Sequence, residues 1–372
     1  MRILVYGASG TLYGGIESFL LNMNDHMSDV CIFDYVIVGD TCIHTHRIHQ
    51  RGGRVYLVTS YKKNPLRFLL DSWKVAKEAK RDHKTAYFNL FSMCHITAVL
   101  MSRVLGYRIV LHAHNNNIPN KSPLYHLLHR FCRRLLRRLL STMDCVRLTN
   151  SEDSSVFMFG NRFSGDQSAE LIYNAIQVEA FRFSPEIREK KRMELELEDA
   201  FTVGFAGRLS AQKNPGFLME IFAQIRHRRE NTVFLVAGDG DLKAYTEQRA
   251  RELGISGHVK FLGRREDLNQ LYQAMDCFVL PSLFEGLGIV LIEAQAAGLP
   301  CFASAEVIPS MVQLSPELMH FISLDTPPAF WAEQILKLTP SSLPRETWNE
   351  VVAKSPFHIV SEATHLERIL LQ

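Results

Sequence analysis

Two glutamates eight positions apart, Glu285 and Glu293, have the spacing to bind a sugar attached to a nucleotide. In CFVLPSLFEGLGIVLIEAQAAGLP, an apolar strand is followed by a glycine-containing turn and a helix that ends at a glycine. Glu285 is therefore expected in the turn and Glu293 on the helix. The unpaired N–H groups of the helix start attract phosphate oxygens, and the flanking carboxylates can accept hydrogen bonds from hydroxyls. The alternative is a first-turn acid placed for the helix dipole and a solvated helix residue.

Two cations follow an earlier apolar strand in the segment TVGFAGRLSAQKN. Arg208 and Lys213 are separated by four residues and come directly after this strand. An arginine fork and a mobile lysine charge at the C-terminal end of a strand can together neutralise a diphosphate. The alternative is a pair of ordinary surface cations, which by themselves carry no function.

The order of these and other motifs resembles the retaining glycosyltransferases of family four, which have the GT-B architecture. The similarity is greatest to the bacterial branch that builds capsular and exopolysaccharides. The motifs that carry the resemblance are GGIESFLLNM, HAHN, GRLSAQKN, VAGDGDL, FLGRREDL, and the E-x7-E segment with AGLP behind it. The resemblance implies transfer of a sugar from a nucleotide-sugar donor, with UDP-sugar favoured, to a hydroxyl of a glycan or lipid-linked acceptor.

The resemblance also implies a role for each motif residue. Arg208 and Lys213 would stabilise the leaving diphosphate. Glu285 would hold the donor sugar together with the N–H groups of Gly286, Leu287 and Gly288, and Glu293 would accept from the ribose hydroxyls. The other donor-binding positions are Gly207, the glycine loop of Gly14 and Gly15, and Leu262, Arg264 and Arg265 beside the base. Retention is expected by same-face attack, in which the leaving phosphate helps to deprotonate the acceptor.

Two histidines end a central strand in the segment HAHNNN. His112 and His114 lie on one face of the strand because they are two positions apart, and His114 is nearer to the loop. The resemblance implies that a histidine here contacts the donor sugar, so His114 is included among the catalytic residues. The alternatives are metal binding and a simple polar end of the strand. A zinc site requires further ligands, and the other histidines are scattered without helpful spacing.

No metal or other cofactor is expected. The D-G-D sequence of Asp239 to Asp241 is explained by the chemistry of a turn after a strand. A nicotinamide oxidoreductase remains an alternative because of the first glycines. However, Gly7, Gly10 and Gly14 give G-x-x-G-x-x-x-G instead of the dinucleotide spacing G-x-G-x-x-G. A non-catalytic scaffold of the same fold is the third hypothesis, and the intact set of two cations and two glutamates argues against it.

These residues must be positioned by alternating strands and helices. The chain has 372 residues, 47% of them hydrophobic, which favours two domains, and its net charge of +3 gives no indication of nucleic-acid binding. The alternation predicts an α/β fold of GT-B architecture, with two doubly wound Rossmann-like domains facing across a cleft. The expected domains are 1–175, with a C-terminal helix of about 355–372 packing back on it, and 176–354. The polar stretch 174–200 is expected to be the linker and the entry into the second domain.

The expected strands are short apolar runs. The first set is RILVYG, DYVIVG, RVYLV, TAYFN, RIVLHAH, CVRLTN and AELIYN, and the second is TVGFAG, TVFLVAG, VKFLG, CFVLPS, LPCFAS and HFISL.

The remaining features concern location. Seven cysteines without a C-x-x-C pair, and a first strand in place of a signal peptide, indicate a cytoplasmic protein. The segment 125–140, YHLLHRFCRRLLRRLL, predicts a basic amphipathic helix. Such a helix either lies on an anionic membrane surface, peripheral to the cytoplasmic face, or is a domain helix with a solvated basic face.

Overall fold

The computed structural model describes residues 1–11, 15–90, 96–114, 134, 137–140, 142–160, 169–338 and 342–372. It divides into two compact units, one of Met1–Ala175 with Ile359–Gln372 and one of Ile176–His358. Each unit contains one sheet in which all strand pairs are parallel. The α/β fold with two Rossmann-like units is therefore as expected.

The sheet of the first unit has the strand order β3-β2-β1-β4-β5-β6-β7. Its strands are β1 (Arg2–Tyr6), β2 (Ile32–Val38), β3 (Val55–Val58), β4 (His83–Leu90), β5 (Arg108–Ala113), β6 (Val146–Thr149) and β7 (Glu170–Leu171). Its helices are α1 (Gly15–His26), α2 (Thr45–Gln50), α3 (Pro65–Ala79), α4 (Ile96–Val104), α6 (Glu152–Met158) and α14 (Ile359–Leu371).

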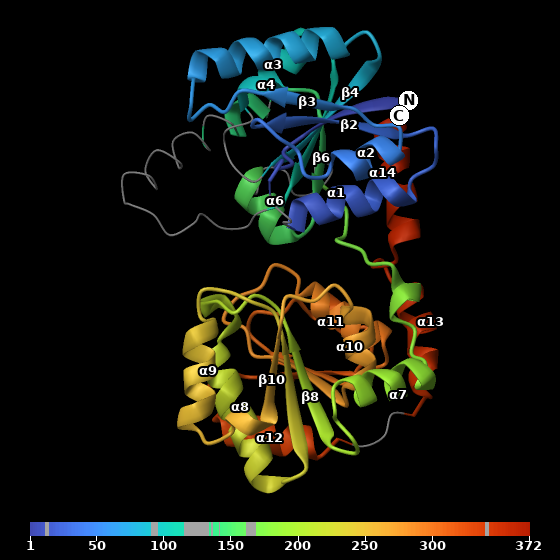
Figure 1. Cartoon of the computed structure of the whole chain (residues 1–372). Helices are drawn as coiled ribbons and strands as arrows, with labels where there is room; N and C mark the ends of the chain where they lie inside the picture. The colour runs from blue at the N-terminus through green and yellow to red at the C-terminus, as the bar shows by residue number, and fades with distance from the viewer. Residues whose placement is uncertain are drawn as a thin grey trace. The chain divides into compact units, whose positions relative to one another are not determined.

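Alternating side chains of β1 pack into two separate hydrophobic cores. Ile3 and Val5 pack with α1, α2 and α14 on one face of the sheet, whereas Leu4 and Tyr6 pack with α3 and α4 on the other. The last helix, α14, contacts α1 (Figure 1). Both faces of these strands are covered, which explains why they are continuous apolar runs in the sequence.

The sheet of the second unit has the order β10-β9-β8-β11-β12-β13. Its strands are β8 (Phe201–Ala206), β9 (Thr232–Ala237), β10 (Val259–Gly263), β11 (Cys277–Leu280), β12 (Cys301–Ser304) and β13 (Met319–Ile322). Its α-helices are α7 (Pro185–Glu194), α8 (Pro215–Arg228), α9 (Lys243–Glu252), α10 (Leu268–Ala274), α11 (Ile289–Ala296), α12 (Pro328–Leu336) and α13 (Trp348–Ala353). Short 3₁₀ helices are η3 (Val178–Phe181), η4 (Ala211–Lys213), η5 (Ser256–His258), η6 (Ser310–Val312) and η7 (Arg345–Thr347).

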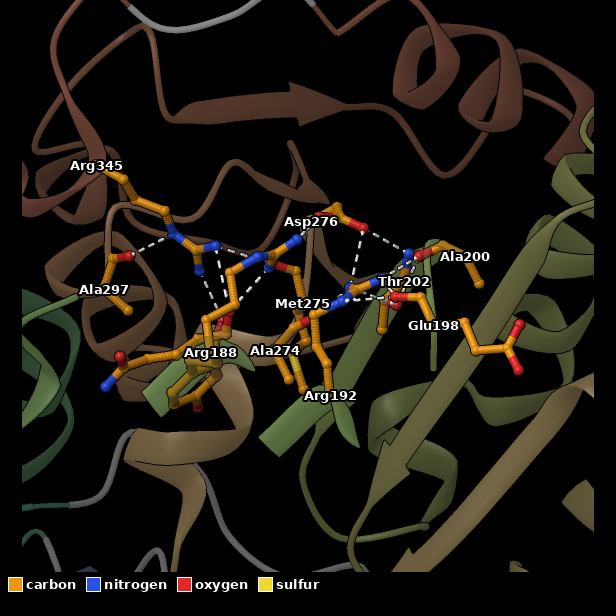
Figure 2. A network of polar contacts seen from close by, with 12 residues as sticks. Arg188, Arg192, Glu198, Ala200, Thr202, Ala274, Met275, Asp276, Ala297 and Arg345 are labelled. Carbon is orange, nitrogen blue, oxygen red and sulfur yellow. Dashed lines mark hydrogen bonds and ion pairs between the residues drawn. The ribbon is translucent and has the colours of Figure 1, made fainter. Parts of the chain in front are cut away.

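The polar stretch expected as a linker is part of the second unit. It forms η3 and α7, and α7 packs against α10. The Ser184 hydroxyl caps α7 by accepting from the Ile187 N–H at 3.3 Å, and Pro185 occupies the first turn. Two of its charged residues, Arg188 and Arg192 of α7, point into the unit, as Figure 2 shows.

Three arginines hold the amino ends of β8 and β11. Arg188 donates to the carbonyl oxygens of Gln273 and Met275, both at 2.9 Å, and pairs with Asp276 at 2.6 Å (Figure 2). Arg192 donates to the carbonyls of Ala274, Ala200 and Glu198 at 2.7 to 3.3 Å. Arg345 donates to the carbonyls of Tyr272, Gln273, Met275 and Ala297 at 2.7 to 3.4 Å. Most of these carbonyls belong to the C-terminal end of α10, where cations satisfy oxygens that the helix leaves without a partner.

Candidate active site

The candidate site of the second unit lies where its strand order reverses. From β8 the chain moves outward through β9 and β10, and then returns to β11 on the other side of β8. Ligands of open α/β sheets bind at the carboxyl ends of the strands on either side of such a reversal. The loop after β8 carries Gly207, Arg208 and Lys213, and the loop after β11 carries Glu285 to Gly288. The fold therefore brings together two segments that are about seventy residues apart.

Lys213 and Glu285 form a direct ion pair at this position. The Lys213 Nζ contacts Glu285 Oε1, and the two side chains are only 14% and 6% exposed. Ser282 Oγ donates to the same Oε1 at 2.7 Å, and Gln212 Nε2 lies 3.5 Å from Oε2. From the sequence, Lys213 is expected to bind the diphosphate of a donor and Glu285 its sugar. In the structure these two side chains contact each other. Ser282 and Gln212 were not identified from the sequence because nothing in their spacing distinguishes them.

Arg208 is much more exposed than Lys213. Its Nη2 lies 3.2 and 3.1 Å from the two carboxylate oxygens of Asp241, and the two side chains are 68% and 78% exposed. Asp241 belongs to the D-G-D turn after β9, where it contacts a cation of the candidate site. An exposed pair of this kind contributes little stability. Arg208 can therefore exchange Asp241 for a phosphate at small cost.

Backbone hydrogen bonds donated by two glycines join the ends of β8, β9 and β10. Gly207 N–H donates to the Ala237 carbonyl at 3.0 Å, and Gly238 N–H donates to the Gly263 carbonyl at 2.7 Å. A Cβ at Gly238 would lie 1.9 Å from the Gly207 oxygen, and Gly238 has a φ of +145°. Only glycine fits there, because both the space and the backbone conformation exclude a side chain.

Glu293 lies on α11 and contacts a buried tyrosine. Gly288, with φ +76° and ψ +50°, is the N-cap of α11, and Gly298, with φ +62°, follows its end, as the sequence indicated. The Tyr272 hydroxyl of α10 donates to Glu293 Oε2 at 2.8 Å. Burial raises the pKa of the Glu293 carboxyl to about 7, although the Tyr272 hydrogen bond acts in the opposite direction. The sequence did not identify Tyr272, which is 21 positions away and meets Glu293 only through packing.

The segment Leu262 to Arg265 forms the end of β10 and the following turn. Leu262 is half-buried and Arg264 is exposed. Arg265 Nε and Nη2 contact the Asp267 carboxylate at 2.7 and 2.6 Å, and Arg265 also lies 3.7 Å from Glu194 of α7. The Arg265 side chain is thus held by acids of its own unit. The contact with a base that the resemblance implies is one through the backbone of this segment, which would not require the guanidinium.

His114 and His112 lie at the carboxyl end of β5 in the first unit. Asn89 donates to the Tyr6 carbonyl at 3.2 Å, which orients its Oδ1 to accept from His114 Nε2 at 2.8 Å. The Tyr87 hydroxyl lies 2.6 Å from His112 Nδ1. Burial lowers the pKa of His114 to about 3 and that of His112 well below its usual value. Both imidazoles are therefore neutral.

The tautomers follow from these partners. With a proton on Nε2, His114 keeps Nδ1 as an acceptor. Tyr87 is neutral because burial raises its pKa, so it donates to His112 Nδ1 and leaves the proton of His112 on Nε2. Among the described residues, that Nε2 has no hydrogen-bond partner. Neither Tyr87 nor Asn89 was identified from the sequence, since each lies within an ordinary strand pattern.

The glycine loop of the first unit is described only in part. Gly14 lies outside the described residues, and Gly15 is the first residue of α1. Glu17, in the first turn of α1, accepts from the Ser9 N–H at 2.7 Å and so ties the loop after β1 to this helix.

Most of the basic helix expected at 125–140 lies outside the described residues. Within the described part, Arg137 donates to the carbonyls of Val156 and Phe157 at 2.6 and 2.8 Å. These oxygens belong to α6, so Arg137 satisfies backbone carbonyls near the end of another helix. Among the helices that the structure describes, none has the length and apolar character needed to cross a bilayer. The described residues also contain no cluster of three or more His, Cys, Asp or Glu side chains able to hold a metal.

Residues 186–345 match the family model described as Glycosyl transferases group 1. The putative glycosyltransferase EpsF of Bacillus subtilis is 29% identical over 360 residues, which cover 93% of this chain and 90% of EpsF. A second relative is the UDP-Gal:alpha-D-GlcNAc-diphosphoundecaprenol alpha-1,3-galactosyltransferase of Escherichia coli. It is 34% identical over 142 residues, 36% of each chain.

Solved glycosyltransferase structures share the fold. HepE of Anabaena, crystallised in complex with UDP, aligns over 100% of both chains with a TM-score of 0.81 and 21% identity. WaaG, a glycosyltransferase involved in lipopolysaccharide biosynthesis, aligns over 99% of both chains with a TM-score of 0.73 and 16% identity. The family match over residues 186–345, the relative that spans nearly the whole chain and the two Rossmann-like units agree with one another: the chain is similar to the group 1 glycosyl transferases and has the GT-B fold.

Proposed function

We propose that this protein is a retaining glycosyltransferase that uses a UDP-sugar donor. The acceptor is a hydroxyl of a glycan or lipid-linked sugar in the synthesis of cell-surface polysaccharide. The observation that carries the proposal is the Lys213–Glu285 pair at the reversal between β8 and β11, with Arg208 in the same loop as the lysine. The E. coli relative is named for a UDP-galactose donor and a lipid diphosphate acceptor, and HepE was crystallised with UDP. Both names favour uridine nucleotides.

The donor site requires an exchange of partners. Lys213 and Arg208 would move from their carboxylate partners to the donor diphosphate, where they stabilise the charge that develops on the leaving group. Glu285, released from Lys213 but still bonded to Ser282, would accept hydrogen bonds from the sugar hydroxyls. Glu293 would accept from the ribose. Two cations supply the counter-charge of the diphosphate, and the proposed reaction therefore uses no metal ion.

The proposed reaction exchanges one bond at the anomeric carbon for another. The bond from this carbon to the diphosphate oxygen breaks with both electrons leaving on the diphosphate. The acceptor oxygen bonds to the same face of the carbon, and its proton passes to a leaving phosphate oxygen. In the first unit, His114 is neutral and presents its Nδ1 as an acceptor, which suits a hydrogen bond from a donor-sugar hydroxyl. We place the reaction in the cytoplasm, at the inner face of the membrane when the acceptor is lipid-linked.

A ligand screen tests this proposal directly. The purified protein is heated with UDP, GDP, ADP, their common sugars and NAD, in the presence of a chelator, because a ligand that binds only the native state raises its melting temperature. Uridine nucleotides are expected to raise the melting temperature and the others are not. A shift with NAD alone would overturn the proposal in favour of an oxidoreductase. For the donor so identified, NMR of the product gives the anomeric configuration, and inversion would disprove the retaining mechanism.

A further inference from the structure

The outer side of α3 exposes a stripe of large apolar side chains. Leu66 and Leu70 are 74% and 70% exposed, and Trp73 is 37% exposed. Positions four and seven apart lie on one side of a helix, so the three side chains form one stripe. The opposite side of α3 contributes Phe68 and Ala76 to the core. Leu66 and Leu70 therefore take little part in the packing of the first unit, and Trp73 is partly exposed beside them.

Cations surround this stripe. Arg67, Lys74 and Lys77 are exposed on α3, and the segment 61–84 contains eight Lys and Arg residues against three Asp and Glu residues. Its net charge of +5 exceeds the +3 of the whole chain. One of the acids, Asp71, is tied to the segment after β3, because its Oδ2 accepts from both the backbone N–H and the hydroxyl of Thr59, at 3.2 and 2.5 Å, and its Oδ1 lies 3.9 Å from Arg67 Nε. The outer side of α3 is thus both apolar and positively charged.

The neighbouring helix extends the same kind of surface. α4 packs against α3 on one face of the sheet (Figure 1). It exposes Leu100 (40%) and Val104 (77%), and Arg103 between them is also exposed. Exposed apolar groups beside a cation therefore occur on both of these packed helices.

We propose that this α3 surface, formed by Leu66, Leu70 and Trp73 with their surrounding cations, binds a membrane that contains anionic lipids. A helix with tryptophan and leucine beside lysine and arginine is suited to the boundary between headgroups and acyl chains, where the apolar groups insert and the long cationic side chains reach the phosphates. A protein partner fits less well, since lysine is depleted in protein interfaces. The positive charge complements an anionic headgroup layer.

This proposal goes beyond the sugar transfer and is independent of it, because it requires only that the protein binds lipid. It also differs from the membrane helix expected at 125–140, since α3 is described in full and was not identified from the sequence.

Tryptophan fluorescence provides a direct test. The protein has three tryptophans, and Trp331 and Trp348 are buried, with 0% and 4% exposure, so a change on adding lipid reports on Trp73. Vesicles of phosphatidylcholine with one quarter phosphatidylglycerol are expected to shift the emission to the blue. Brominated lipids are expected to quench it. Vesicles of phosphatidylcholine alone should do neither, and Trp73→Phe should abolish both changes. An unchanged spectrum with anionic vesicles would overturn the proposal.

Vesicle sedimentation with paired variants tests which surface binds. Leu70→Ser with Lys74→Ala removes one apolar and one cationic group from α3 and should weaken binding to anionic vesicles by about tenfold or more. The matched control is Met193→Ser with Lys190→Ala on α7, where Met193 is 74% exposed and Lys190 is exposed, and it should bind as the wild type does. Equal binding by the α3 variant would assign the membrane contact to another segment, such as 125–140. Melting temperatures and UDP binding of both variants should match the wild type, which separates this test from that of the proposed reaction.

Discussion

The charged side chains at the amino ends of β8 and β11 and those at the carboxyl ends of these strands have different kinds of partner. At the amino ends, Arg188, Arg192 and Arg345 donate mainly to backbone carbonyls (Figure 2). At the carboxyl ends, Lys213 and Arg208 contact the side chains of Glu285 and Asp241. A backbone carbonyl cannot move away without disturbing its helix or strand, whereas a carboxylate on a loop can release its cation to a ligand.

From this contrast we infer that the arginines at the amino ends stabilise the fold, whereas the cations at the carboxyl ends bind the donor. Burial lowers the pKa of Arg345 to about 9, and four carbonyl partners compensate for that burial. Lys213 and Glu285 neutralise each other at the reversal between β8 and β11, where a ligand is expected. Substitutions at the amino ends should therefore act on stability, and those at the carboxyl ends on donor binding and turnover.

The largest effect is expected from the double substitution Lys213→Met with Glu285→Gln. It removes charge stabilisation of the leaving diphosphate, so sugar transfer should fall about a thousandfold, or about 4 kcal/mol in the barrier. The free energy of unfolding should change by only about 1 kcal/mol, because replacing a buried pair as a unit leaves no charge unpaired. Turnover and urea unfolding measure the two quantities. A large loss of stability with turnover intact would reverse the assignment of this cluster.

Arg345→Met should have the opposite profile. The carbonyls of Tyr272 and Ala297 lose this donor, those of Gln273 and Met275 keep only Arg188, and the unit is expected to lose about 3 kcal/mol of unfolding free energy. UDP affinity at low temperature should remain within about twofold of the wild type. Arg182→Met is the matched control, since its side chain is 55% exposed and lies 4.0 Å from Glu350. It should change stability by less than about 0.5 kcal/mol. An equal effect of both substitutions would contradict the structural role of Arg345.

Glu293 should make stability depend on pH. Burial raises the pKa of its carboxyl from the ordinary value of 4.5 to about 7, so between these values the folded state binds more protons than the unfolded state. Its contribution to stability is therefore fully present below about pH 4.5 and is lost as the pH rises to about 7. Relative to Glu293→Gln, the wild type should lose on the order of 2 to 3 kcal/mol at most across this window. Urea unfolding at pH 5, 6, 7 and 8 measures the gap, and parallel curves for the two proteins would disprove the shift.

The smallest effect is expected from Tyr272→Phe. The hydroxyl donates to Glu293 and favours its ionised form, so its loss should raise the pKa of Glu293 further. Donor affinity should fall about fivefold at pH 7, corresponding to about 1 kcal/mol, and recover in part at pH 8.5 where the carboxylate is again ionised. Titration of UDP-sugar at both pH values checks this. A loss that is the same at both would mean that Tyr272 acts by packing alone.

The strands were predictable because burial on both sheet faces gives uninterrupted apolar runs such as CFVLPS and TVFLVAG. The loop glycines were predictable for a similarly local reason, as the φ of +76° at Gly288 requires a residue without a side chain. The partners of the charged residues could not be predicted from the sequence. Arg188 and Arg192 have the pattern of solvated helix charges, and their acceptors are backbone carbonyls about 80 residues further on that carry no sequence signal. Tyr272 and the exposed stripe on α3 likewise depend on which side of a helix the tertiary fold covers.

Calorimetric titration of UDP into three proteins tests the central claim most directly. The proteins are the wild type, Lys213→Met with Glu285→Gln, and Arg345→Met at a temperature where it is folded. If the donor site lies at the carboxyl ends of β8 and β11, UDP should bind the wild type and Arg345→Met alike and the double variant at least about tenfold more weakly. Equal affinity for all three proteins would place the donor site elsewhere and contradict the account.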